Sequence, residues 1–177
     1  MKNKSLVNMP CPVARSLEHV GEWWNILILR EALLGVSRFD DFQNHLGIAT
    51  STLAKRLNAL VESGLLARRQ YCEKPPRDEY VITKKGLDFR PVLLTLMQWG
   101  NTYYADGEPM IQLVDTETNQ AVDLMLVDRN TQVEIDPQRH QSQPRPAADD
   151  MIKARFEASS AAVAMPQQGP VDQYLKT

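Results

Sequence analysis

The fold is decided by one stretch of sequence, residues 47–86, which reads GIATSTLAKRLNALVESGLLARRQYCEKPPRDEYVITKKG. The apolar residues of its first half recur at the spacing of one face of an α-helix: Leu53, Leu57, Leu60 and Val61. This spacing predicts a helix from about Ser51 to Ser63, and Gly64 ends it.

The second half of the stretch predicts a β-hairpin. Two segments, Leu65 to Gln70 and Glu79 to Thr83, have the composition of strands. Between them Tyr71 to Asp78 is polar and carries two prolines, which cannot donate to a β-ladder. We therefore expect Tyr71 to Asp78 to form a loop at the hairpin tip.

Three further helices are expected before this stretch. Apolar residues recur at helical spacing from Ser16 to Leu34, and Gly21 divides that segment into a short and a longer helix. A short helix follows at Phe39 to Leu46, with Asp40 and Asp41 in its first turn, where acidic groups favour the helix dipole.

Downstream of the hairpin, Thr83 can cap another helix, and Pro91 begins or kinks its amphipathic second half, Val92 to Tyr104. Two similar segments come next, beginning at Ile111 and at Leu124. Each is an apolar run followed by a polar turn, and this pattern predicts one or two small hairpins.

From residue 137 the chain is rich in Pro, Gln and Ala, which predicts a flexible tail with at most a weak helix near Asp150–Val163. The expected fold class is mainly α with a β-hairpin wing. We expect a winged helix-turn-helix domain at 1–107, a small β-rich extension at 108–136 and the tail at 137–177.

The charge distribution separates these parts. The formal net charge is −2, but residues 1–107 hold 14 Lys and Arg against 11 Asp and Glu, whereas residues 108–177 hold 6 against 11. The net charges are therefore +3 and −5, so the basic groups are concentrated where a phosphate backbone could use them.

Several function classes are disfavoured. No apolar run is long enough to cross a bilayer, no secretory signal is expected, and the sequence lacks metal-ligand spacing, a catalytic triad or a Gly-rich phosphate loop. We therefore expect a cytoplasmic protein that is not an enzyme, has no catalytic residues, and holds no metal or cofactor.

The order of three helices and a basic hairpin is typical of a winged helix-turn-helix, in which the last of these helices, here Ser51 to Ser63, enters the DNA major groove. The preceding helix, Phe39 to Leu46, is then the bracing helix, which crosses the DNA backbone. The expected DNA-binding residues lie at the helix that enters the groove, on the hairpin and before the bracing helix: Thr50, Ser51, Thr52, Lys55, Arg56, Lys74, Arg77 and Arg38. The alternative for Lys55 and Arg56 is an ordinary solvated helix face.

Two runs resemble the HxlR-type bacterial transcription regulators: CPVARSLEHVGEWWNILILREALLGVSRFDDF, and GIATSTLAKRLNALVESGLLARRQYCEKPPRDEYVITKKGLDFRPVLLTLMQWG. The resemblance covers roughly Cys11 to Gly100. It includes an N-terminal Cys-Pro, Arg-Phe opening the bracing helix, Leu-x-x-Arg-Leu-x-x-Leu in the recognition helix and Pro-Pro-Arg-x-Glu-Tyr at the wing tip.

This resemblance implies a homodimer that binds double-stranded DNA. The dimer would be built from the N-terminal segment and the helix around Pro91–Tyr104. The sequence departs from the family at Ala49, so that Thr50 must supply the helix cap or the cap is lost, and at Ser51, where a basic residue is common. The operator sequence therefore cannot be transferred from relatives.

Cys11 matches a cysteine with which some members of this family sense oxidants or electrophiles. The alternative is a small buried hydrophobe at the dimer interface. Cys72, near the wing, is expected to be incidental. A small-molecule effector is a further option, because four aromatic residues could line a pocket: Trp23, Trp24, Trp99 and Tyr103. These residues could equally form interface core.

The sequence thus favours a homodimeric, sequence-specific DNA-binding transcriptional regulator. The alternative function is a winged-helix interaction module that docks partner proteins through its acidic C-terminal extension.

Overall fold

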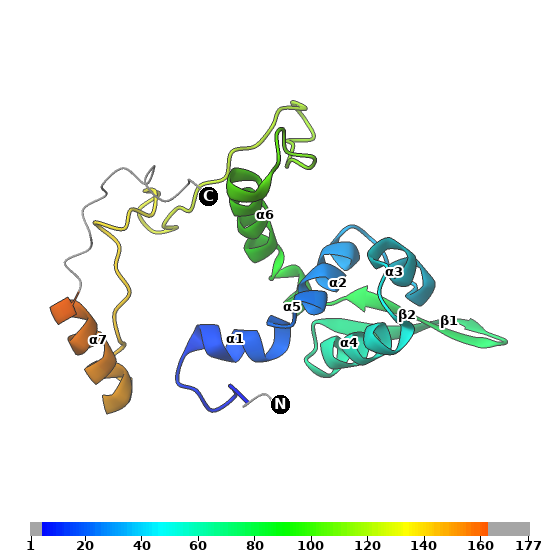
Figure 1. Ribbon diagram of the computed structural model, residues 1–177, viewed down its shortest axis with the longest axis horizontal. Helices are drawn as coiled ribbons and strands as arrows, with labels where there is room; N and C mark the ends of the chain where they lie inside the picture. The colour runs from blue at the N-terminus through cyan, green and yellow to red at the C-terminus, as the bar shows by residue number, and fades with distance from the viewer. Residues whose placement is uncertain (1–4, 163–177) are drawn as a thin grey trace. The chain divides into compact units, whose positions relative to one another are not determined.

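The computed structural model describes residues 5–162, and for residues 159–162 it describes the backbone alone (Figure 1). Its elements in chain order are α1 (Pro12–Val20), α2 (Trp23–Leu33), α3 (Phe39–Leu46), α4 (Thr50–Glu62), β1 (Leu66–Glu73), β2 (Pro76–Ile82), α5 (Lys84–Leu87), α6 (Arg90–Tyr104) and α7 (Asp150–Ala162). The chain divides into two compact units, with the boundary between Leu124 and Met125.

The core of the first unit lies where α2, α3 and α4 meet the base of the hairpin. Its largest fully buried side chains are Ile28, Leu29, Phe42, Leu53, Leu57, Leu60 and Leu66. Leu53, Leu57 and Leu60 belong to the predicted stripe of α4, which confirms that stripe as the buried face; its fourth member, Val61, is half-buried. The mainly helical fold with a hairpin wing is also confirmed.

The hairpin is longer than the sequence predicted. Strands β1 and β2 are antiparallel, and Cys72 pairs with Arg77 and Glu73 with Pro76, so that only Lys74 and Pro75 remain at the tip. The expected loop over Tyr71 to Asp78 is therefore wrong. The prolines are compatible with this ladder because Pro76 is the first residue of its strand, where a missing N–H is tolerated.

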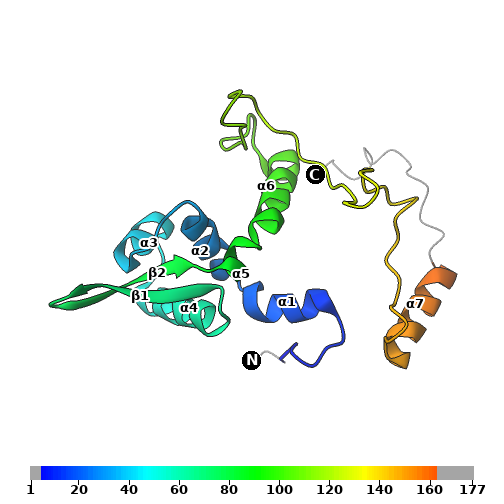
Figure 2. The same cartoon turned by 180° about the vertical axis from the view of Figure 1, so that it is seen from behind.

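The hairpin projects beyond helices α3 and α4, as both views of the ribbon show (Figures 1 and 2). Its base is tied to the start of α3. The N–H of Tyr80 donates to the carbonyl of Ser37 at 2.7 Å, the Ser37 hydroxyl donates to Glu79 at 2.8 Å, and Arg38 forms a β-bridge with Glu79. These contacts fix the direction of the wing relative to the helices.

The two similar segments after α6 form two similar turns. In the first, the N–H of Asn119 donates to Asp115 O at 2.8 Å; in the second, the N–H of Gln132 donates to Asp128 O at 2.7 Å. Asn119 and Gln132 are both left-handed, with φ 56°. Each turn is closed by one β-bridge, Val114 with Ala121 and Val127 with Glu134.

The first of these turns is held on α6. Gln98 donates to Asp123 Oδ1 at 3.2 Å and to Leu124 O at 3.0 Å, and Asn101 donates to Ile111 O at 2.9 Å. In the second unit, residues 150–162 of the predicted tail form α7, in agreement with the weak helix expected there. The rest of that tail, residues 163–177, lies outside the described residues.

An almost buried carboxylate joins α2 to α3. Glu31 accepts hydrogen bonds from Arg30 at 2.7 Å, and its second oxygen lies 2.9 Å from His45 Nδ1. Burial raises the pKa of Glu31, but the hydrogen bonds with His45 and Arg30 together outweigh burial and hold the pKa below its ordinary value of 4.5.

Because folding lowers the pKa of Glu31, its ionised form stabilises the protein above pH 4.5, and this contribution is lost as the pH falls through the lower folded pKa. We expect Glu31→Gln to lower the free energy of unfolding at pH 7 by about 1–3 kcal/mol and to flatten its fall in acid. Urea unfolding across pH measures this, with exposed Glu117→Gln as the control. If the free energy of unfolding of Glu31→Gln fell at low pH as steeply as that of the unmodified protein, the stabilising role of ionised Glu31 would be contradicted.

A second prediction concerns Gly86 in α5. A Cβ at this buried position would collide with the carbonyl oxygen of Leu65 and lie 2.8 Å from Ile82 Cγ1. Gly86→Ala should therefore lower the free energy of unfolding by about 1–3 kcal/mol, because backbone has to move. The neighbouring Lys84→Ala, at an exposed position, should stay within about 0.5 kcal/mol. Equal urea midpoints for the two variants would refute this close approach.

Candidate nucleic-acid interface

Helix α4 presents its polar face outward because its apolar face is committed to the core. Leu53, Leu57 and Leu60 have no exposed surface, whereas Ser51 and Lys55 are exposed and lie on the remaining circumference. A helix with one buried stripe and polar residues opposite it is the geometry that a major groove accepts.

The first backbone N–H groups of α4 receive no side-chain cap. The N-cap residue of this helix is Ala49, which provides no side-chain cap, and Thr50 is the first helical residue. The Thr50 hydroxyl instead accepts a hydrogen bond from Gln43 Nε2 on α3 at 3.0 Å. Of the two outcomes considered from the sequence, the cap is therefore lost, and the first N–H groups of α4 are left for solvent or an anion.

Arg56 is placed apart from the other candidates on α4. Its Nη2 donates to Glu22 Oε2, just before α2, at 2.8 Å, and its side chain is 19% exposed. The structure thus groups Thr50, Ser51, Thr52 and Lys55 at the beginning of α4, while Arg56 faces α2.

Asn58 on α4 contacts the wing. Arg68 of β1 donates to Asn58 Oδ1 at 2.7 Å, and its guanidinium lies 5.5 Å from the centre of the Tyr80 ring. No sequence pattern indicates this pair, since the two residues belong to different elements. Their contact fixes the wing against α4.

The cations of the wing differ in their partners. Arg69 is paired with Glu79 at 2.7 Å. By contrast, Lys74 and Arg77 are exposed and form no ion pair with any residue that the structure describes, and the same holds for Lys55 on α4. An unpaired cation can bind a phosphate without first breaking an ion pair.

Arg38 lies against the wing, although it precedes α3 in the sequence. It is the N-cap residue of α3, is exposed, and its guanidinium lies 4.9 Å from the centre of the Tyr71 ring on β1. A cation over a ring face keeps its charge available while its side chain is ordered. Tyr71 was missed from the sequence because it was assigned to a loop.

The other sequence candidates lie elsewhere. Cys11 is the half-buried N-cap residue of α1. The four aromatic residues form one pair in each of two helices: the rings of Trp23 and Trp24 in α2 are tilted to each other with centres 4.5 Å apart, and the ring centres of Trp99 and Tyr103 in α6 are 6.0 Å apart.

No cluster of His, Cys, Asp or Glu among the described residues is suited to a metal ion. No helix among these residues has both the length and the apolar character needed to span a membrane.

The model of the HxlR-like helix-turn-helix family matches residues 19–108. The protein belongs to this family. An uncharacterized HTH-type transcriptional regulator of Mycobacterium tuberculosis is 41% identical over 148 residues, which are 83% of this chain and 91% of the relative. This HxlR-like protein is therefore a transcriptional regulator, which confirms that it is not an enzyme.

Two solved structures of transcription regulators are similar to this chain. The crystal structure of the transcription-factor candidate PA1607 has a TM-score of 0.72 and 33% identity, and covers 80% of this chain and 100% of its own. The redox regulator HypR in its oxidized form has a TM-score of 0.50 and 28% identity, and the match covers 54% of this chain and 99% of the HypR chain. The match to the mycobacterial relative covers 148 residues, whereas only 107 residues precede residue 108. The similarity therefore extends into the segment after residue 107.

The missing cap of α4 gives a prediction. Ala49 has extended backbone angles, φ −62° and ψ 137°, which suit a capping hydroxyl. Ala49→Thr should therefore exceed its isosteric partner Ala49→Val by about 1 kcal/mol in free energy of unfolding. Urea unfolding at one protein concentration tests this. Equal stability of the two variants would show that the α4 terminus is already satisfied.

Proposed function

We propose that this HxlR-like regulator acts in the cytoplasm as a homodimer that binds double-stranded DNA in a sequence-specific manner. One observation carries the proposal: the uncapped, polar beginning of α4 comes with exposed, unpaired cations on α4 and on the wing. Lys55, Lys74 and Arg77 have no ion-pair partner in the described part of the chain.

In this proposal α4 lies in the major groove. Ser51 and Thr52 can donate and accept hydrogen bonds at base edges, while Lys55 and the first N–H groups of α4 bind phosphate. Lys74 and Arg77 on the wing, with Arg38 beside them, bind the neighbouring backbone. Arg56 contributes by holding α4 against α2 through Glu22.

The homodimer rests on α6. None of its residues is buried, and one stripe of large apolar side chains is about half exposed: Val92, Leu96, Trp99 and Tyr103. A helix with such a face is unfavourable in water. A second copy offers the same stripe, and pairing two copies about a twofold axis would bury both stripes. It would also place two α4 helices for two DNA half-sites.

Removing an unpaired wing cation should weaken DNA binding in a specific way. We expect Arg77→Ala to weaken binding to all sequences by a similar factor and to reduce the slope of log affinity against log salt by about one. Arg69→Ala is the matched control, because Arg69 is paired with Glu79 and should change the slope less. Fluorescence anisotropy on a selected operator and on random DNA measures both. A salt slope identical in Arg77→Ala and the unmodified protein would refute the phosphate contact.

The apolar stripe of α6 gives the second test. Leu96→Asp places a charge in the proposed interface and should yield a monomer in sedimentation equilibrium, because burying an unpaired carboxylate costs several kcal/mol. Thr102→Asp, at an exposed position of α6 outside the stripe, should leave the dimer mass unchanged. Monomeric unmodified protein at micromolar concentration would exclude the dimer.

A further inference from the structure

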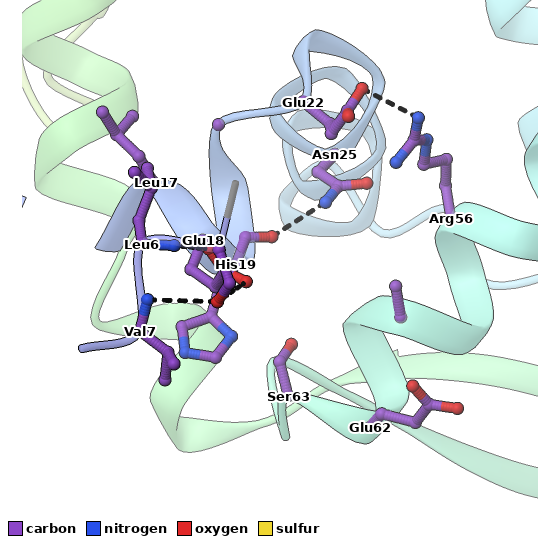
Figure 3. A pocket seen from close by; sticks show the side chains of 13 residues that line it. Leu6, Val7, Leu17, Glu18, His19, Glu22, Asn25, Arg56, Glu62 and Ser63 are labelled. Carbon is purple, nitrogen blue, oxygen red and sulfur yellow. Dashed lines mark hydrogen bonds and ion pairs between the residues drawn. The ribbon is translucent and has the colours of Figure 1, made fainter. Parts of the chain in front are cut away.

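A cavity of about 890 Å³ lies between the N-terminal segment, α1, the beginning of α2, and α4. One side is apolar and is formed by Leu6, Val7 and Leu17, while Asn25 and Arg56 line the cavity from α2 and α4 (Figure 3). Its volume falls within the range of about 300–1,000 Å³ that is usual for small-molecule sites. It is distinct from the exposed face of α4 described above.

Two polar atoms among its lining residues are buried and have no hydrogen-bond partner in the described part of the chain: Asn25 Oδ1 and Arg56 Nε. Asn25 is only 3% exposed. Its Nδ2 donates to the carbonyl of His19 at 2.8 Å, and because a carbonyl only accepts, the orientation of this amide is fixed. An acceptor and a donor are thus left unsatisfied, and burial makes that costly.

The charges around the cavity disfavour an anionic occupant. Its lining contains three carboxylates, Glu18, Glu22 and Glu62, against one guanidinium, Arg56, which is already paired with Glu22. The backbone N–H of Leu6 and the hydroxyl of Ser5 hold the pKa of Glu18 below its ordinary value, so Glu18 stays ionised at neutral pH.

We propose that this cavity binds an uncharged small molecule that carries an alcohol or amide group on an apolar body. The polar group donates to Asn25 Oδ1 or accepts from Arg56 Nε–H, which a shift of these side chains must first uncover because both atoms are buried, and the apolar body packs on Leu6, Val7 and Leu17. Because Arg56 belongs to α4, such a ligand acts on the position of the DNA-reading helix. This regulatory part rests on the proposed function, whereas the binding site itself does not.

The site is tested without DNA, by NMR on the isotope-labelled full chain. Phenol and benzamide are the probes; toluene, which has no polar group, and benzoate, which is anionic, are the controls. We expect phenol and benzamide to give saturable shifts of the Arg56 Nε–H and Asn25 amide resonances. We expect toluene and benzoate to give none at the same concentrations.

Three results would overturn the site. The first is the absence of a saturable shift with both phenol and benzamide, which would leave water as the partner of these polar atoms. The second is an equal response to toluene, which would show that the polar group is not recognised. The third is a shift of Arg56 Nε–H that follows protein concentration and not the probe, which would identify a second copy of the chain as the occupant.

Two variants confirm the location. Ala59→Phe fills the cavity from α4 and should abolish the saturable shifts, while Ala121→Phe, the same substitution at an exposed position outside the cavity, should leave them unchanged. Asn25→Ala removes the acceptor and should weaken the binding of both probes about tenfold. Unaltered affinity in the two cavity variants would refute the site.

The regulatory part is measured separately, as the DNA affinity of the unmodified protein with and without saturating probe. We expect a change of about fivefold or more that is absent in Ala59→Phe. Probe binding in a protein that binds no DNA would disprove the proposed function and leave the site intact. DNA binding with silent Arg56 and Asn25 resonances would disprove the site and leave the proposed function intact.

Discussion

The structure depends on the burial of one face of α4. Leu53, Leu57 and Leu60 are fully buried, and their packing against α2, α3 and Leu66 of β1 provides most of the small core. Removing any one of these side chains from the core would leave a void in a close-packed interior. The orientation of α4 about its axis is therefore fixed by its apolar face, and the outward direction of Ser51 and Lys55 follows from it.

The same constraint explains how much could be predicted from the sequence. Helical periodicity located α2, α3 and α4 within a residue or two, because it directly reports which side chains are buried. The wing was predicted too short, since the prolines were taken as strand breakers, whereas Pro76 stands at a strand start where no donor is needed. A rule about residue type failed where position within the strand decides the outcome.

Lys55 and Arg56 show where sequence reasoning ends for the site. They are adjacent, both are basic, and local sequence gives them the same expected role. The structure separates them, because Arg56 meets Glu22, a residue 34 positions earlier in the chain, and Lys55 meets no acid among the described residues. Whether a basic residue is neutralised depends on its tertiary partners, so the 14 Lys and Arg residues among residues 1–107 overstate the number of cations available to a phosphate backbone.

Helix α4 is also held by polar contacts on two sides. Arg56 joins it to Glu22 before α2, and Asn58 joins it to Arg68 of the wing, at 2.8 and 2.7 Å. Unlike the apolar core, which tolerates little displacement, such hydrogen bonds can be exchanged for bonds to a ligand at small net cost. A group that alters the surroundings of Arg56 therefore changes the restraint on α4 without disturbing Leu53, Leu57 or Leu60. For this reason the two faces of one helix can have separate roles: the buried face sets stability, and the polar tethers set how firmly the DNA-reading residues are positioned.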